Sequence, residues 1–363
     1  MNDRTPEGLL TRLLCESNEV QRPTYLMLRA EPTRIVLVFE TGSASPRCVF
    51  KAARDGSALE ALEKEHRILS DLRARAPAGF RDTLPRPIAR GERSGLVGYL
   101  TRALPGARMK DLPPSRLFGS STAGPTLRTI TDWLVEFYEA AGIVRGGWSD
   151  PGREELFDAP AEKYMKWFRV TADERALIRE CLEHLPGPGR QDLPVCRGHG
   201  DFSPANVLWD NGRIGVIDYE YAFEPCVPLD DLFHFLASMK SSTSARGREA
   251  ARQAFFEETF YTAGHLSRAA RDAVHTLARR MGVDLEHVER LFVLAWVRYA
   301  VRGVELRIHE LELASLADDP ERLWQRLDDE PEEFLPVIRI RGGICGNVRQ
   351  HVELRDRFAL AKR

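Results

Sequence analysis

The sequence predicts an α+β protein in which a small strand-rich region with one helix precedes a larger, mainly helical region. Three observations predict this class. Short β-like runs separated by turn residues fill the chain up to about residue 104. From about Pro113 onward the apolar residues take up helical spacing. A single hairpin pattern, Val207–Ile217, interrupts the helical part.

The N-terminal region is expected to hold five strands around one helix. A leucine-rich amphipathic segment within residues 1–22 precedes them. Turn residues such as those of Thr41–Pro46 separate the apolar runs, which is typical of an antiparallel meander. The strands are expected at Tyr25–Arg29, Arg34–Glu40, Arg47–Ala52, Ile88–Glu92 and Leu96–Ala103, and the helix at Ser57–Arg75.

The second region is expected to be helical. Its predicted helices are Thr126–Gly142, one or two within Asp158–Leu185, Leu229–Met239, Arg246–Tyr261, Arg268–Arg280 and Leu285–Ile308. We therefore divide the chain into residues 1–104, residues 105–335 and a basic C-terminal tail, 336–363.

Composition excludes several classes of function. The 363 residues include 52 Lys and Arg against 54 Asp and Glu, a net charge of -2, which argues against nucleic acid as a partner. No apolar run approaches the roughly 20 residues that span a bilayer, so no membrane partner is expected. The N-terminus lacks the pattern of a secretory signal, and the six cysteines form no C-x-x-C pair. These features favour a cytoplasmic protein with reduced thiols.

The segment Gly198–Asp231 carries the most specific pattern. His199, Asp201 and Asn206 precede two short β-like runs joined by Asp210-Asn211-Gly212, which is a strong hairpin signal. A hairpin places the residue before its first strand beside the residue after its second. Asn206 and Asp218 are therefore expected to lie close together, with Asp201 on the loop that leads in.

This arrangement suits phosphoryl transfer, which needs positioning and charge neutralisation more than covalent chemistry. Asp201 would orient or deprotonate the attacking hydroxyl. Asn206 and Asp218 would supply the hard oxygen ligands that Mg²⁺ prefers. His199 is best placed as a scaffold for the loop. An Asp-Asn turn network without catalysis is the alternative interpretation.

A strand lysine and a helix glutamate support the same chemistry. Lys51 lies within an apolar strand, and Glu65 follows fourteen residues later on the predicted helix. A lysine that holds nucleotide phosphates and is oriented by a glutamate is a kinase arrangement. Glu63 is a rival partner, but Leu69 and Leu72 favour an inward-facing Glu65. A lysine whose ammonium merely reaches solvent is the alternative.

Together these motifs resemble the aminoglycoside phosphotransferase and choline kinase-like family, which has the bilobal protein-kinase-like fold. The matching segments are Val49-Phe50-Lys51, Glu65–Leu72, Gly98–Gly106, His199–Asn206, Val216–Glu220 and Pro228–Leu232. The resemblance implies transfer of the γ-phosphoryl group of ATP or GTP to a hydroxyl of a small molecule. It makes residues 1–104 the nucleotide-binding lobe and 105–335 the catalytic and acceptor-binding lobe, with backbone groups near Leu100 and Arg102 holding the base.

Two departures from the family pattern stand out. The first turn, Arg29–Arg34, contains no glycine, although a Gly-rich phosphate loop is expected there. No activation segment follows Asp218, which argues for a small acceptor over a protein acceptor. The glycine-free turn supports an alternative function, a non-catalytic kinase-like nucleotide-binding or scaffold protein.

The acceptor stays open between aminoglycosides, choline-like amines, sugars and amino-acid alcohols. The acidic stretch 305–333 could form a negative wall for a polycationic acceptor, or simply a solvated face. Trp133, Trp148, Trp167 and Trp296 could contribute to a cage for a quaternary amine, or simply pack in the core. The sequence does not fix the oligomeric state.

Overall fold

The computed structural model describes residues 6–29, 33–144, 150–168, 170–186, 193–222, 225–239, 255, 257–260, 262–310 and 314–328. Two compact units divide the chain. Unit 1 comprises Met1–Ile143, Cys196–Glu224 and His234–Thr276, and unit 2 comprises Val144–Val195, Pro225–Phe233 and Leu277–Arg363. The expected α+β class is confirmed. The expected boundary near residue 104 lies inside unit 1 and stays a prediction.

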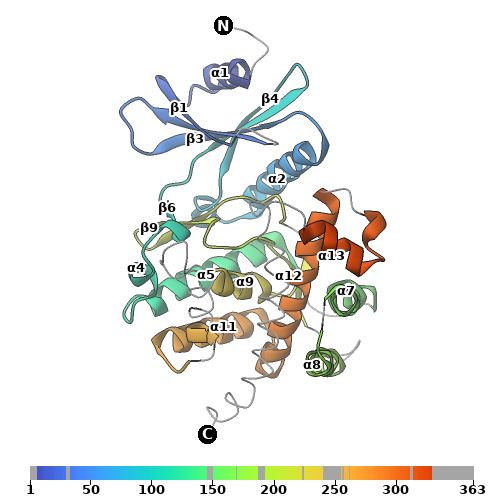
Figure 1. Cartoon of the computed structure of the whole chain (residues 1–363). Coiled ribbons are helices and arrows are strands. Elements are labelled where there is room, and N and C mark those ends of the chain that lie inside the picture. The colour runs from blue at the N-terminus through green and yellow to red at the C-terminus, as the bar shows by residue number, and fades with distance from the viewer. Residues whose placement is uncertain are drawn as a thin grey trace. The chain divides into compact units, whose positions relative to one another are not determined.

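A five-stranded antiparallel sheet forms the N-terminal part of unit 1 (Figure 1). Its strands run in the order β1-β2-β3-β5-β4. Their bounds are β1 Pro23–Arg29, β2 Arg34–Glu40, β3 Pro46–Ala53, β4 Arg86–Arg93 and β5 Leu96–Arg102. The register places Lys51 of β3 between Ile35 of β2 and Tyr99 of β5, so the lysine lies on a central strand.

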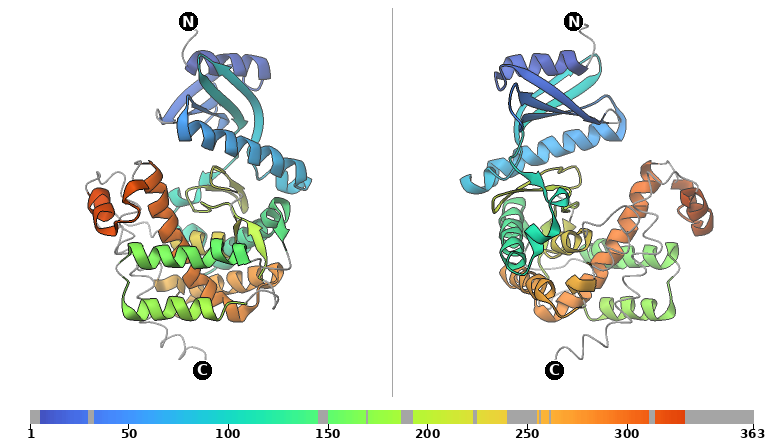
Figure 2. Two further views of the ribbon diagram at one scale, coloured as in Figure 1. Left: turned by 90° about the vertical axis from the view of Figure 1, so that its right-hand side faces the viewer. Right: turned by 60° about the vertical axis from the view of Figure 1, so that its left-hand side comes forward.

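Helices α1 (Pro6–Ser17) and α2 (Gly56–Arg75) cover opposite faces of this sheet (Figures 1 and 2). The leucines of α1 pack with Val38 and Phe50 in one apolar cluster. Leu62 of α2 packs with Val97 and Tyr99 in another. Both helices bury one apolar stripe at helical spacing, which is how an amphipathic helix gains stability on a sheet.

A second small sheet in unit 1 contains the predicted hairpin. Strands β9 (Val207–Asp210) and β10 (Arg213–Val216) pair antiparallel, and β6 (Ala107–Arg108) adds to the far side of β9. Asn211 has φ 49° and Gly212 has φ 89°. Two consecutive positive φ angles identify a type I′ turn, the form that the Asp-Asn-Gly sequence predicts.

The rest of the described chain is largely helical. The helices are α3 Ala78–Arg81, α4 Pro114–Phe118, α5 Ala123–Ala141, α6 Asp150–Arg153, a π-helical turn Glu154–Asp158, α7 Ala159–Trp167, α8 Ala172–Glu183, α9 Asp230–Ser238, α11 His265–Met281, α12 Val288–Glu310 and α13 Pro320–Asp328. The 3-10 turns are Met109–Asp111, Leu285–His287 and Ala314–Leu316, and the remaining short strands are β7 Ile143–Val144, β8 Val195–Arg197 and β11 Pro225–Cys226.

Helix α5 supports the hairpin within unit 1. Trp133 is buried and stacks on both Phe137 and Phe202, with ring centroids 5.1 and 5.3 Å apart. Its indole N–H donates to the Thr83 hydroxyl at 2.9 Å, and the Thr83 carbonyl accepts from the Val216 N–H at 3.0 Å. This aromatic packing fixes the loop that contains Phe202 against the end of β10.

Helices α7, α8 and α12 form the core of unit 2, where α12 packs against both of the others. Asp230 and Arg298 form a buried ion pair there, and the Arg298 guanidinium also lies over the Phe157 ring. The indole N–H of Trp167 donates to the Ala317 carbonyl at 3.0 Å, which connects α7 to the chain before α13.

Several expectations fall partly or wholly outside the described residues: residues 30–32 of the glycine-free turn, most of the Arg246–Tyr261 helix, Trp148, Cys345, the end of the acidic stretch and the tail 336–363. No disulfide joins the cysteines in the described part of the chain. Within that part, no helix is long and apolar enough to cross a bilayer.

Gly106 connects the two sheets of unit 1. It has φ +106°, and a Cβ at this position would meet the Trp209 carbonyl oxygen at 2.7 Å. Only glycine combines this backbone conformation with so close an approach to a neighbouring strand. Gly106 therefore allows the chain leaving β5 to pair with β9 through β6.

We predict that Gly106→Ala lowers the free energy of unfolding by about 2 kcal/mol or more, because the new Cβ meets both a strained φ and a backbone atom. Chemical denaturation followed by circular dichroism measures this change. Gly124→Ala is the control, since Gly124 lies in the first turn of α5 and a Cβ added there would have nothing within 4 Å. That control should be neutral or stabilising by up to about 1 kcal/mol, and equal losses in both variants would contradict the prediction.

Candidate active site

The hairpin places Asn206 beside Ile217, next to Asp218. The Ile217 N–H donates to the Asn206 carbonyl at 3.0 Å, which connects the two ends of the hairpin. Asn206 is buried, and its amide N–H₂ donates to the Asp201 carboxylate at 2.8 Å and to the Asp201 carbonyl at 3.0 Å. Since the amide nitrogen is occupied in this way, the Asn206 side-chain oxygen is the atom left to face a ligand.

Lys51 lies between two carboxylates that come from different elements. Its ammonium contacts the Glu65 carboxylate at 2.7 and 2.9 Å and the Asp218 carboxylate at 3.1 Å. Glu65 also accepts from the Tyr219 N–H at 3.5 Å. Glu65 on α2 is thus the partner of Lys51, whereas the rival Glu63 pairs with Arg90 at 3.4 Å. Strand β3, helix α2 and the chain after β10 meet at this one ammonium group.

Burial and charge compete in this cluster. Burial alone would lower the pKa of Lys51, but the carboxylates of Glu65 and Asp218 outweigh it and raise the pKa. Burial alone would raise the pKa of Asp218, but Lys51 above all, and also His199 and Arg108, hold it below its usual range. Both groups are therefore charged at neutral pH.

Two further features mark the chain around Asp218. Asp218 adopts φ 71°, a left-handed conformation that is uncommon for a residue with a side chain and that recurs at functional sites. Burial, followed by the charge of Asp218, raises the pKa of Glu220 to about 7. The site therefore concentrates negative charge beside Asp218.

His199 is fully buried under the loop that contains Asp201. Its Nδ1 accepts from the Asp201 N–H at 3.4 Å, and its ring packs on Tyr219 with centroids 4.7 Å apart. These contacts connect the ring to the loop, and the scaffold role of His199 stays a prediction. Asp201 itself keeps 38% of its side chain exposed, so its carboxylate can be reached from solvent.

A cavity of about 290 Å³ adjoins the lysine cluster within unit 1. Its apolar wall comes from β1, β2, β3 and α2, and its polar end holds Lys51, Glu65, Asn206 and Asp218. Arg108 and Lys110 also line it. An apolar cavity with a few convergent polar groups is the usual form of a small-molecule site.

The expected base-binding residues of β5 take different positions. The Leu100 side chain is fully buried in the apolar cluster under α1 and does not line the cavity. Thr101 and Ala103 line the cavity, and so does Arg102. The Arg102 guanidinium is ion-paired with Glu19, so its contribution to the cavity is mainly structural.

One residue near Asp201 was not predicted from the sequence. The His234 Nδ1 lies 3.9 Å from an Asp201 carboxylate oxygen, and His234 belongs to α9. The run Asp230–His234 opens a helix soon after the hairpin region, which was the available signal. Helical spacing alone did not indicate which side of α9 faces the loop.

The features considered for the acceptor have ordinary structural partners. In unit 2, Glu305 pairs with Lys163, and Asp318 pairs with Lys166 at 2.7 Å, all on exposed surface. Trp133, Trp167 and Trp296 are each buried. These residues therefore contribute to surface charge balance and to core packing.

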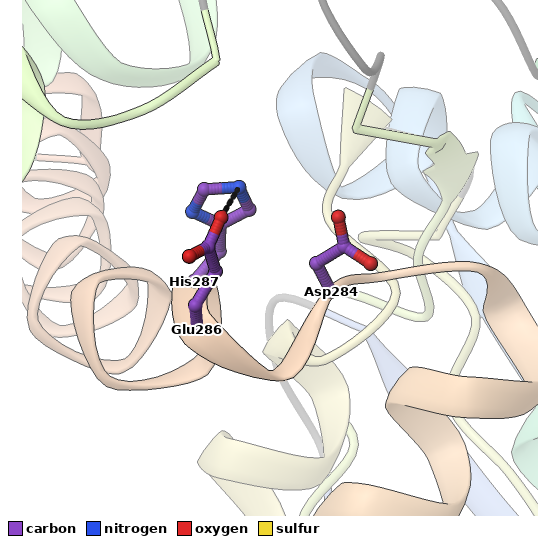
Figure 3. Close-up of side chains that lie close together, drawn as sticks. All are labelled: Asp284, Glu286 and His287. Carbon is purple, nitrogen blue, oxygen red and sulfur yellow. Dashed lines mark ion pairs between the residues drawn. The ribbon is translucent and has the colours of Figure 1, made fainter.

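A second group of potential metal ligands lies in unit 2. Asp284, Glu286 and His287 place one ligand atom each within 4.8 Å of one another (Figure 3). His287 already pairs with Glu286 at 3.5 Å and with the Arg290 guanidinium at 3.2 Å. Since a neighbouring cation opposes metal binding and both carboxylates are exposed, we assign this group no function.

A profile of the phosphotransferase enzyme family matches residues 33–261, which contain strands β2 to β5 of the sheet, the lysine cluster and the hairpin. The chain belongs to this family. Its kinase-like α+β fold is thereby confirmed, and so is the broad activity class, transfer of a phosphoryl group. A comparison with curated proteins finds no match.

Solved structures that are similar to this chain include three phosphotransferases. A macrolide 2'-phosphotransferase from Brachybacterium faecium is 18% identical over 87% of this chain and 99% of its own, with a TM-score of 0.48. Aminoglycoside phosphotransferase APH(4)-Ia is 17% identical over 86% and 96%, with a TM-score of 0.47. Aminoglycoside phosphotransferase APH(3'')-Id from Streptomyces rimosus, in complex with ADP and streptomycin, is 16% identical over 82% and 99%, with a TM-score of 0.45.

We predict that Lys51→Met lowers the free energy of unfolding at pH 7 by about 3 kcal/mol, because two carboxylates lose their shared cation. The lowered pKa of Asp218 gives stability that is present above its unfolded value of about 3.8 and is lost as the pH falls through the folded pKa. The difference between the two proteins should therefore shrink below about pH 4.

Urea denaturation at several pH values measures this difference. Arg67→Met is the control, because Arg67 is an exposed residue of the same helix as Glu65, and it should stay within about 0.5 kcal/mol of wild type. A loss in Lys51→Met that does not depend on pH would show that packing, and not charge, explains the effect.

Proposed function

We propose that the protein is a small-molecule kinase that transfers the γ-phosphoryl group of ATP or GTP, with Mg²⁺, to a hydroxyl acceptor. One observation carries the proposal: Lys51, Asn206 and Asp218 line the same cavity, and Asp201 is hydrogen-bonded directly to Asn206. Phosphoryl transfer needs this combination of a fixed cation, hard oxygen ligands and an adjacent carboxylate.

The residues around Asp218 fit a magnesium ion. Mg²⁺ binds through one or two protein oxygens and keeps the remaining positions for water and substrate phosphates. The Asp218 carboxylate and the Asn206 side-chain oxygen are a donor set of this kind, and both residues line the cavity. When bound there, the ion would neutralise negative charge on the nucleotide phosphates.

Asp201 is the proposed catalytic base. The acceptor hydroxyl oxygen forms a bond to the γ-phosphorus, the bond from that phosphorus to the β,γ-bridging oxygen breaks, and the hydroxyl proton passes to the Asp201 carboxylate. Asn206 holds that carboxylate in place through its 2.8 Å hydrogen bond. Buried His199 holds the loop through the hydrogen bond that its Nδ1 accepts from the Asp201 N–H.

Lys51 is proposed to hold the nucleotide phosphates, with Glu65 fixing its orientation. Backbone groups of the segment that includes Leu100 and Arg102 are proposed to bind the base. Residues 1–104 would form the nucleotide-binding lobe and 105–335 the catalytic and acceptor-binding lobe. We propose the cytoplasm as the location of the protein, on the scattered cysteine pattern of the sequence, which has no C-x-x-C pair.

The short segment between Asp218 and the next helix supports a small molecule, and not a protein, as the acceptor. Helix α9 begins at Asp230, soon after Asp218, which leaves little chain for an activation segment of the kind that protein kinases use. We therefore propose an alcohol group on a small molecule as acceptor. Aminoglycosides, choline-like amines, sugars and amino-acid alcohols form the first panel to test.

We predict that Asp201→Ala abolishes acceptor-stimulated nucleotide consumption, by about 10²-fold or more, while nucleotide affinity stays within about threefold. The measurement is ATP and GTP consumption with magnesium across the acceptor panel, together with calorimetric binding of the nucleotide. Turnover near the wild-type rate in the variant would remove Asp201 from the proposed role.

We predict that Asp218→Ala loses magnesium-dependent nucleotide binding as well as turnover, because it removes the only carboxylate of the proposed metal pair. Calorimetry with and without magnesium measures this loss. Asp71→Ala is the control, since Asp71 is an exposed carboxylate on α2. If the wild type neither binds nucleotide nor consumes it with any acceptor, the non-catalytic scaffold function replaces the proposal.

A further inference from the structure

Strand β6 and the 3-10 turn that follows it place two cations, Arg108 and Lys110, in the wall of the cavity. The backbone of Arg108 pairs with that of Leu208 in β9. The Lys110 N–H donates to the Pro204 carbonyl at 2.9 Å. Pro204 belongs to the loop between Asp201 and Asn206. The backbone of residues 107–110 is therefore tied to the same hairpin and loop that hold the proposed catalytic groups.

Arg108 has an unusual environment for a half-buried arginine. It lines the cavity with Lys51 and Asp218, and it is close enough to help lower the pKa of the Asp218 carboxyl. Among the described residues, its guanidinium has no hydrogen-bond or ion-pair partner. Arg102 lines the same cavity but is ion-paired with Glu19. A half-buried guanidinium whose N–H groups have no hydrogen-bonded anion is stabilised by a ligand that supplies one.

The lysine cluster cannot supply enough positive charge for a triphosphate. Lys51 contributes one positive charge and already contacts two carboxylates, Glu65 and Asp218. The cluster therefore carries a net negative charge and would repel an anionic ligand. The first turn, Arg29–Arg34, also lacks the glycines whose backbone N–H groups approach phosphates closely.

We propose that Arg108, with Lys110 beside it, binds the phosphate groups of the nucleotide and provides positive charge that the lysine cluster does not. This inference rests on the proposed function, because it assigns the ligand of the same cavity as a nucleoside di- or triphosphate. The planar guanidinium can donate two parallel hydrogen bonds to one phosphate. Lys110 is exposed, so its contribution is screened by solvent and is the smaller of the two.

The test is calorimetric titration of wild type and Arg108→Gln with ATP, ADP and adenosine, all with magnesium, and with the guanosine series in parallel. We expect Arg108→Gln to weaken nucleoside triphosphate binding by roughly ten- to a hundredfold, the usual range for losing a charge-assisted hydrogen bond. Nucleoside affinity should stay within about twofold, because a nucleoside carries no phosphate. Arg108→Lys should restore part of the affinity for the triphosphate, since lysine keeps the positive charge but cannot donate two parallel hydrogen bonds to one phosphate.

Arg116→Gln is the matched control, because it removes the same charge from an exposed position on α4. Thermal unfolding establishes that each variant folds. If Arg108→Gln does not fold, the triphosphate affinities of Arg108→Lys and wild type are compared instead. Unchanged triphosphate affinity in a folded Arg108 variant overturns the inference. An equal loss for nucleoside and triphosphate also overturns it, because Arg108 would then shape the cavity without contacting phosphate.

The two proposals fail in different ways. Nucleotide binding that depends on Arg108, without phosphoryl transfer to any acceptor, would contradict the proposed function and support the phosphate site. Full phosphoryl-transfer activity in Arg108→Gln would support the proposed function and contradict the phosphate site at Arg108. A wild type that binds no nucleotide overturns both.

Discussion

The structure of unit 1 depends on one ammonium group held between two carboxylates. Lys51 comes from the middle of a sheet, Glu65 from the helix packed on that sheet, and Asp218 from the chain that leaves the hairpin. Each element could pack by its apolar residues alone in several ways. The ion cluster selects one arrangement, because Lys51 is the cation that the Glu65 and Asp218 carboxylates share, and without it both would be left uncompensated. The electrostatic requirement thus fixes the relative positions of three segments that are distant in sequence.

Backbone contacts connect this cluster to the proposed catalytic loop. Gly106 permits β6 to approach β9, and Asn206 receives the Ile217 N–H while its own amide holds Asp201. The carboxylate that would take a proton and the oxygen atoms that would hold a metal are therefore fixed by the same short hairpin. Preorganisation of this kind is what phosphoryl transfer requires, since positioning does most of the catalytic work.

Much of this arrangement was predictable because it follows from local chemistry. Alternating apolar residues and turn residues predicted the five strands, and Asp210-Asn211-Gly212 predicted the hairpin that brings Asn206 toward Asp218. What escaped prediction depends on tertiary contact. Strand β6 has only two residues and exists because β9 offers it a partner. The approach of His234 to Asp201 depends on which side of α9 faces the loop, and the burial of Leu100 depends on α1 packing above the sheet.

The charge balance of the site argues that the cluster serves a ligand as well as stability. Buried ion pairs seldom stabilise a fold more than apolar residues of similar size would, because desolvation offsets their attraction. Here two carboxylates share one lysine, a raised pKa marks Glu220 nearby, and Asp218 adopts a strained left-handed conformation. Stability alone does not explain why two carboxylates are gathered around one ammonium group. All of these features become favourable when cations and an anionic group enter together, since a divalent ion offsets the carboxylates and the basic side chains on β6 and beside it offset the phosphates. This charge balance is the reason for proposing a metal-bound polyphosphate ligand here.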